Sequence, residues 1–154
     1  MTSEDHPGVL IFPPLLFGIC IVGGAIAHVV CPYRLELPLW ARGSGAAAGL
    51  AAVLFAIWGE RTMKAAGTNV RPDRPATTIV DSGPFAFTRN PLYSAVLGLF
   101  VGTGIALDSP AFLSVVVPLF VVLHFGVVLR EERYLESKFG ADYRGYKARV
   151  RRWL

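Results

Sequence analysis

The sequence predicts an all-α membrane protein with four transmembrane helices, a cytoplasmic loop and amphipathic C-terminal helices. Hydrophobic residues make up 53% of the 154 residues and charged residues only 17%, whereas a soluble domain is usually about 25% charged. Four long stretches contain no Asp, Glu, Lys or Arg, and the basic residues between them are very unevenly distributed. These three observations favour a single helical membrane domain over residues 1–154.

The four uncharged stretches define the expected transmembrane helices. The helices expected from them cover about residues 8–30, 43–60, 91–107 and 109–129, within which Glu60, at the end of the second, is the only Asp, Glu, Lys or Arg residue. A helix that crosses a bilayer needs roughly 20 apolar residues, so the first and fourth stretches are long enough. The second and third reach that length with flanking residues. The alternative is the buried core of a soluble helical protein, and the low charge content disfavours it.

The first stretch is expected to stay in the mature protein. A secretory signal begins with a positively charged region. The residues before this stretch include Glu4 and Asp5 but no Lys or Arg. They are therefore unlike the start of a signal peptide.

Basic residues fall mainly on one side of the predicted bundle. With four helices crossing the membrane, the N-terminus, the loop 61–91 and the tail 130–154 share that side. It carries 13 of the 15 basic residues, namely Arg61, Lys64, Arg71, Arg74, Arg89, Arg130, Arg133, Lys138, Arg144, Lys147, Arg149, Arg151 and Arg152. Basic loops stay in the cytoplasm, so we expect both termini there, in a bacterial inner membrane. The positive charge then faces anionic lipid headgroups, and no nucleic-acid-binding module accompanies it.

The loop over residues 61–91 separates the second and third expected helices. It begins as a helical continuation of the second helix, and its glycines and prolines then enforce turns. These are Gly67, Pro72, Pro75, Gly83 and Pro84. Long ordered loops in small proteins are usually functional. We therefore expect an ordered loop that binds a cofactor, with a flexible linker as the alternative.

The tail over residues 130–154 is polar, with regularly spaced aromatic and apolar residues. These recur at intervals of three and four, which predicts amphipathic helices at the membrane surface. They are Tyr134, Leu135, Phe139, Tyr143, Tyr146, Val150 and Trp153. Gly140 is expected to divide the tail into two helices.

His124 and Glu131 are candidates for a functional site at the end of the fourth helix. An ionisable residue inside a transmembrane segment is a functional candidate by default. In an α-helix, residues seven apart differ by about 20° around the axis, so His124 and Glu131 would share a stripe. The alternative for His124 is a hydrogen bond to a neighbouring helix. Glu131 and Glu132 are suited to a cationic ligand, or are surface charges paired with Arg130 and Arg133.

Two motifs resemble the isoprenylcysteine carboxyl methyltransferases and the related integral-membrane phospholipid methyltransferases. They are AGTNVRPDRPATTIVDSGPFAFTRNPLYSA, which leads into the third helix, and REERYLESKFGADYRGYKARV, which follows the fourth. The resemblance covers roughly residues 60–152. It implies a small transmembrane bundle with a cytoplasmic S-adenosylmethionine pocket. The implied activity is methyl transfer to a hydrophobic or lipid-like acceptor that enters from the bilayer.

The resemblance also implies which residues contact the cofactor. By position they are Val70, Thr77, Thr78, Ile79, Val80, Phe85, Asn90, Pro91, Leu92, Tyr93 and Glu131. Arg89 joins them because its guanidinium is able to neutralise the carboxylate of S-adenosylmethionine. Phe85 or Tyr93 is suited to stack on the adenine or face the sulfonium, and Glu131 to hydrogen-bond the ribose or the amino group. Arg89, His124 and Glu131 are the candidate catalytic residues, and no metal is expected.

Two positions depart from the family pattern. Asn90 stands where members often have His, and Asn keeps the capacity to hydrogen-bond. Val127 stands where the eukaryotic enzymes have an Arg that meets the substrate carboxylate, one turn before Glu131. The sequence therefore leaves open which acceptor, and which of its atoms, is methylated.

Two other functions fit parts of the pattern. Membrane sterol and steroid reductases share a similar tail and use NADPH. A non-catalytic protein would keep the fold as a scaffold or lipid-binding module. The segment SGPFAFTRNPLY is more similar to the methyltransferases, and no second basic cluster is obvious for the 2′-phosphate of NADPH.

The charge distribution generates a test of topology. Cysteines introduced at Ser3 and at Ser137 should react with a membrane-impermeant thiol reagent from the same, cytoplasmic, side. A cysteine at Glu36, between the first two helices, serves as the control for the opposite side, with Cys20 and Cys31 replaced by Ser. Labelling of Ser3→Cys and Ser137→Cys from opposite sides would mean that one transmembrane helix has been miscounted.

Overall fold

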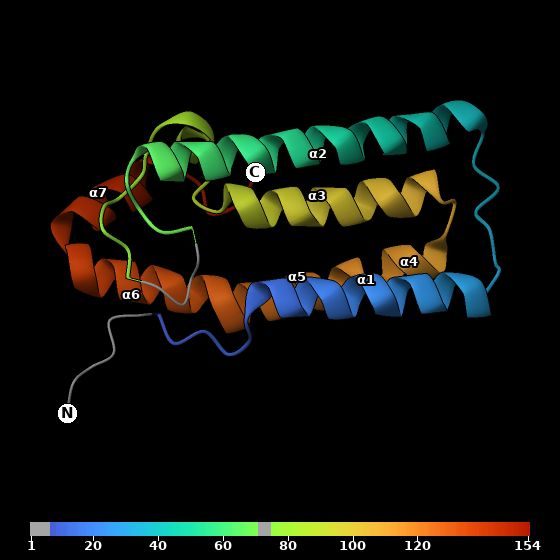
Figure 1. Ribbon diagram of the computed structural model, residues 1–154, viewed down its shortest axis with the longest axis horizontal. Coiled ribbons are helices and arrows are strands. Elements are labelled where there is room, and N and C mark those ends of the chain that lie inside the picture. Colours follow the sequence, from blue (N-terminus) through green and yellow to red (C-terminus); the bar gives the residue numbers. More distant parts are fainter. Residues whose placement is uncertain (1–6, 71–74) are drawn as a thin grey trace.

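The computed structural model describes residues 7–70 and 75–154, and its regular structure is helical (Figure 1). Ser3, Glu4, Asp5, Arg71, Pro72 and Arg74, which entered the sequence analysis, lie outside the described residues. Within the described ranges there is no β-strand, and an isolated parallel bridge joins Thr88 to Arg151. The predicted all-α class is confirmed.

The helices follow the expected order along the chain. α1 covers Pro13–Val30, α2 covers Leu39–Ala65 and α3 covers Pro91–Ala106. A helical run over Pro110–Phe139 comprises α4 (Pro110–Ser114), α5 (Val116–Val121), a π-helical segment (Val122–Val128) and α6 (Leu129–Phe139). α7 covers Ala141–Arg149, and a 3₁₀ turn over Gly83–Ala86 lies in the loop before α3.

Three helical runs are long and apolar enough to cross a membrane. They are α1, α2 and the run Pro110–Phe139. α3 is also apolar but has 16 residues, which at 1.5 Å per residue is about 24 Å. A fourth transmembrane helix through α3 stays a prediction.

Prolines and one glycine set the helix boundaries. α1, α3 and α4 each begin with a proline, whose missing N–H is not needed in the first helical turn. Ser109 caps α4 by accepting a hydrogen bond from the backbone N–H of Phe112 at 3.1 Å. Gly140, with a φ of 54°, separates α6 from α7, which confirms the predicted division of the tail. The second helix continues to Ala65, as expected for the start of the loop.

Glycines bring α2 and α3 into close contact. A Cβ atom at Gly102 would lie 2.6 Å from the backbone N of Gly49 and 2.7 Å from the carbonyl O of Gly45. No side chain fits at such distances, so the two backbones touch at this point. The helices accordingly lie side by side along their lengths (Figure 1).

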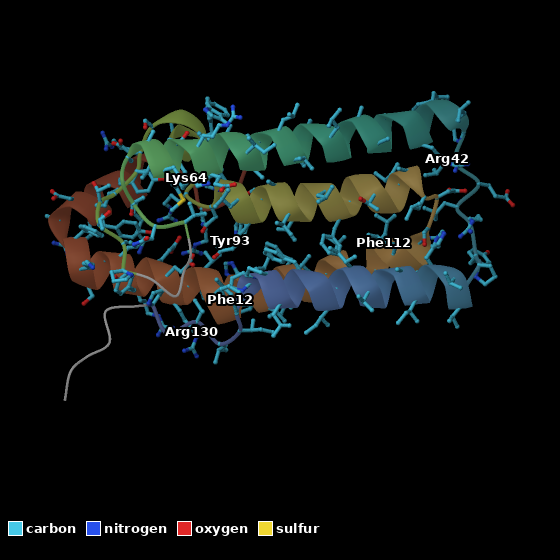
Figure 2. All side chains as sticks on the ribbon, in the orientation of Figure 1. Phe12, Arg42, Lys64, Tyr93, Phe112 and Arg130 are labelled. Atoms are coloured by element: carbon cyan, nitrogen blue, oxygen red, sulfur yellow. The ribbon has the colours of Figure 1, made fainter. Side chains whose placement is uncertain are left out.

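The apolar core lies between α3 and the helices of the opposite layer. α1 packs against α4 and α5 in that layer (Figure 1). The ring of Phe112 stacks on Phe100 of α3 with centroids 5.7 Å apart, and it faces α1 at Gly24. Figure 2 shows Phe112 between α3 and α1. The buried core consists of Leu16, Phe100, Phe112, Leu119, Leu123 and Val127.

The loop before α3 and the tail meet at one end of the bundle. Lys64, near the end of α2, and Arg130, in α6, lie at this end, and Arg42 lies at the opposite end (Figure 2). An apolar bundle can place polar chemistry only at its ends without burying unpaired groups in lipid. This polar end therefore carries the candidate site.

The close approach of α2 and α3 makes Gly102 sensitive to a single added methyl group. We expect Gly102→Ala to lower the thermal stability of the detergent-solubilised protein, because overpacking typically costs about 1–3 kcal/mol. Gly43→Ala on α2 is the matched control, since a Cβ atom there meets nothing within 4 Å. Equal melting temperatures for the two variants would show that the helices are not in contact at Gly102.

Candidate functional site

A cavity of about 140 Å³ lies where the loop before α3, the start of α3, and the helices α6 and α7 meet. Eight of the twelve residues expected at the cofactor line it. They are Val70, Phe85, Arg89, Asn90, Pro91, Leu92, Tyr93 and Glu131. The structure thus brings together loop, helix and tail residues that are up to about sixty positions apart in the sequence.

A second cavity of about 100 Å³ adjoins the first and shares Phe85, Arg89 and Tyr143 with it. Thr78, Ile79 and Val80, three further expected residues, line this second cavity. Thr77 lines neither cavity. Its hydroxyl donates to the carbonyl O of Gly67 at 3.0 Å, and its backbone N–H donates to Thr68 Oγ1 at 3.2 Å, so its side chain fixes the fold of the loop.

A buried charge cluster forms one wall of the site. Arg89 Nη2 lies 3.1 Å from Glu132 Oε1, and their side chains are only 8% and 7% exposed. Arg152 makes two bonds to the same carboxylate, Nε to Oε1 at 2.9 Å and Nη2 to Oε2 at 2.8 Å. Two guanidinium groups therefore share one carboxylate, which leaves one positive charge uncompensated within the cluster.

Arg89 keeps part of its hydrogen-bonding capacity unused. Among the residues that the structure describes, no group accepts a hydrogen bond from its buried Nε or Nη1 atoms. Buried guanidinium nitrogens without partners are costly, and an anion is the group that satisfies them best. Because Arg89 lines both cavities, the site is suited to hold a carboxylate or a phosphate.

Glu131 is held at the cavity by Tyr93. The Tyr93 hydroxyl donates to Glu131 Oε1 at 2.7 Å, and both side chains line the larger cavity. Tyr93 lies between α3 and the opposite layer at the polar end of the bundle (Figure 2). The carboxylate is thus fixed as a hydrogen-bond acceptor beside the cavity.

The two adjacent glutamates have different partners from those expected. One expectation was that both glutamates pair with Arg130 and Arg133 at the surface, and the structure contradicts it. Glu131 bonds Tyr93, and Glu132 bonds Arg89 and Arg152. Arg130 instead donates to the carbonyl O of Gly8 at 3.1 Å, and Arg133 to that of Leu129 in its own helix. No periodicity in the sequence links Glu132 to an arginine twenty positions later.

The tail closes over the loop through backbone hydrogen bonds. The backbone N–H of Arg89 donates to the carbonyl O of Arg151 at 2.8 Å. The carbonyl O of Arg152 accepts from Thr88 Oγ1 at 2.9 Å and from Asn90 Nδ2 at 3.0 Å. The amide of Asn90, which was expected at the cofactor, therefore also fixes the tail.

Two buried tyrosines of α7 support the same wall. The Tyr146 hydroxyl donates to the carbonyl O of Phe85 at 2.8 Å. Burial raises the pKa of Tyr146 well above its usual range, and it does the same to the pKa of Tyr143, where the charge of Glu132 adds to the effect. Both hydroxyls therefore stay neutral at physiological pH and remain hydrogen-bond donors.

The structure does not bring His124 to the cavity. His124 Nδ1 lies 3.3 Å from Trp153 Nε1, and its ring stacks on Phe120 with centroids 5.7 Å apart. The shared stripe with Glu131 assumed α-helical geometry, but Val122–Val128 is π-helical. A π-helical turn contains more residues than an α-helical turn, so His124 is rotated out of line with Glu131.

The described residues contain no group of three or more His, Cys, Asp or Glu side chains arranged to hold a metal ion. Arg89, Glu131 and Glu132 are the acidic and basic side chains among the residues that line the larger cavity. The site therefore offers a guanidinium, a fixed carboxylate and apolar walls to an organic ligand.

Two comparisons with known proteins bear on this site. A family model described as phospholipid methyltransferase matches residues 40–142, which include the loop, α3 and the first turns of the tail. The chain is also similar to an uncharacterized protein of Haemophilus influenzae, with 53% identity over 47 residues. That similarity covers 30% of this chain and 73% of the other protein.

The charge cluster generates a test of stability. Glu132→Gln leaves the buried Arg89 without its anion, so we expect a loss of about 3 kcal/mol or more in the free energy of unfolding. Glu136→Gln, on the same helix, breaks the half-exposed pair with Lys147, which is worth about 1 kcal/mol or less. Thermal unfolding in detergent compares the two variants, and similar losses would contradict a buried cluster.

Proposed function

The chain belongs to the phospholipid methyltransferase family, and on that premise we propose that it transfers a methyl group from S-adenosylmethionine to a hydrophobic or lipid-like acceptor. Family membership implies a methyltransferase, and the helices able to cross a membrane make it an integral membrane protein. The cofactor, the type of acceptor and the residue roles below are the proposal.

The observation that carries the proposal is the pair of unpartnered nitrogens on Arg89. S-adenosylmethionine has a carboxylate, and the planar guanidinium is the side chain best matched to a carboxylate. Nε and Nη1 are buried and lack partners among the described residues, while Nη2 is occupied by Glu132. We therefore assign to Arg89 the carboxylate of the cofactor.

The other walls fit the rest of the cofactor. Glu131, held by Tyr93, is suited to accept hydrogen bonds from the ribose or the amino group. Val70, Phe85 and Leu92 give the cavity an apolar surface against which the adenine is able to pack. The cavity thus offers a carboxyl group held in place, an available guanidinium and apolar walls, and S-adenosylmethionine has polar, anionic and apolar parts to meet them.

Little acid–base chemistry is needed for this reaction. When bound, S-adenosylmethionine would supply an electrophilic methyl group and would leave as the neutral thioether S-adenosylhomocysteine. Arg89 and Glu131 orient the two ends of the cofactor, and the apolar walls exclude water. Alignment in a dry site is the main contribution that these residues make to the rate.

The position of the cavity suits two separate entry routes. It lies at the end of the bundle that carries Lys64 and Arg130, which we propose faces the cytoplasm (Figure 2). The water-soluble cofactor then enters from the cytoplasm and the acceptor from the bilayer. This arrangement takes α3 as a fourth transmembrane helix and both termini as cytoplasmic.

Calorimetry of the detergent-purified protein tests the proposed cofactor. S-adenosylhomocysteine should bind, and Arg89→Gln and Glu131→Ala should each weaken binding by about 10- to 150-fold, the effect of losing a charged hydrogen bond. Arg61→Gln, an exposed arginine at the end of α2, is the control with the same change of charge.

The same measurement separates the alternatives. Binding of NADPH in place of S-adenosylhomocysteine would favour a membrane reductase. Binding of neither would favour a non-catalytic lipid-binding protein.

A further inference from the structure

We propose that Arg152 is a positioning residue for the cofactor site, and that residues 151–153 form a strap that holds it there. The inference rests on the proposed function, because it concerns how Arg89 is kept available for the cofactor. The strap lies beyond residues 40–142, which the family model matches. It is anchored at three places: on the turn before α3, on Glu132, and on His124.

The first anchor is the turn that leads into α3. The carbonyl oxygens of Arg151 and Arg152 accept hydrogen bonds from Arg89 N–H, Thr88 Oγ1 and Asn90 Nδ2, at distances from 2.8 to 3.0 Å. Thr88 is completely buried, and Asn90 is 8% exposed. The strap therefore adds three hydrogen bonds to a turn that also has local ones, from the backbone N–H of Thr88 to the carbonyl O of Pro84 at 3.3 Å and from that of Asn90 to Thr88 Oγ1 at 3.2 Å.

The second anchor sets the geometry of the charge cluster. Arg152 occupies both oxygens of Glu132, so Arg89 meets that carboxylate through Nη2 and Oε1 alone. An isolated arginine and carboxylate prefer a bidentate pair. Without Arg152, Glu132 would be able to turn both oxygens to Arg89 and take up a second nitrogen. Arg152 thus prevents Glu132 from competing with a ligand carboxylate for Arg89.

The third anchor gives a structural role to His124, the polar residue inside the helical run Pro110–Phe139. Trp153 Nε1 hydrogen-bonds His124 Nδ1 at 3.3 Å, and the Trp153 ring lies 5.3 Å from that of Phe120, centroid to centroid. The π-helical segment Val122–Val128 turns His124 to this position, outside the cavity. His124 therefore acts on the site through the strap, with no contact to the cavity.

A pair of ligands distinguishes positioning from general stability. S-adenosylhomocysteine has the carboxylate that Arg89 would bind, whereas 5′-methylthioadenosine has the same adenosine and thioether without the amino-acid end. Arg152→Gln should weaken S-adenosylhomocysteine binding by about 10-fold and change 5′-methylthioadenosine binding by less than about 2-fold. Arg144→Gln, an exposed arginine of α7, is the matched control and should change neither.

A double-mutant cycle gives a second readout. If Arg152 acts through Arg89, the double variant Arg89→Gln/Arg152→Gln should bind S-adenosylhomocysteine no more weakly than Arg89→Gln alone. Arg152→Lys keeps the charge but not the two-point contact, and should show an intermediate loss. If Arg152→Gln does not fold, Trp153→Phe tests the same strap, because it keeps an aromatic ring but removes the N–H that bonds His124. This variant should also weaken the binding of S-adenosylhomocysteine more than that of 5′-methylthioadenosine.

Three results would overturn the proposal. Equal losses for both ligands would mean that the strap only stabilises the fold. Unchanged S-adenosylhomocysteine binding in Arg152→Gln, or additive losses in the cycle, would mean that Arg89 does not depend on it. Failure of the wild-type protein to bind S-adenosylhomocysteine would instead remove the proposed function, and this inference with it.

Discussion

The burial of a single carboxylate, that of Glu132, constrains the whole polar end of the molecule. A buried charge must be paired, and Glu132 takes its partners from the turn before α3 and from the residues after α7. Three segments that are distant in the sequence must therefore meet before this charge is compensated. The cavity is the space that they leave between them, and Arg89 is part of both the cluster and the cavity wall. Structural support and the ligand recognition that we propose thus involve the same ion pairs.

The membrane explains why this arrangement lies at one end. The middle of the bundle is apolar, and the close contact between α2 and α3 depends on glycines. Lipid provides no hydrophobic force that would drive larger side chains together. The Asp, Glu, Lys and Arg residues of these apolar helices lie near the helix ends, and at the end that carries the site the loop and the tail supply partners. Tyr93 and Glu131 lie just where the apolar helices give way to these segments. The candidate site therefore lies where the apolar part of the bundle meets the polar loop and tail.

Local signals in the sequence predicted the fold well and the site in part. Uncharged stretches and Gly140 act within a few residues, and the helices follow them. Eleven of the twelve residues expected at the cofactor line one of the two cavities, although their roles at a cofactor stay predictions. The partners of Glu132 were missed because Arg89 and Arg152 are 43 and 20 positions away from it. The predicted stripe shared by His124 and Glu131 was wrong because it assumed α-helical geometry, whereas Val122–Val128 is π-helical.

The strap also has a consequence for the order of events during synthesis. Its residues, 151–153, are made after every helix of the bundle. Domains begin to form from the N-terminal side as the chain emerges. The apolar helices are therefore in the membrane before the turn that carries Arg89 receives its last hydrogen bonds. A nascent chain that has not yet been extended past Trp153 would therefore have its apolar helices but lack the strap that we propose for Arg89, so the proposed site would be completed only after the helices have formed.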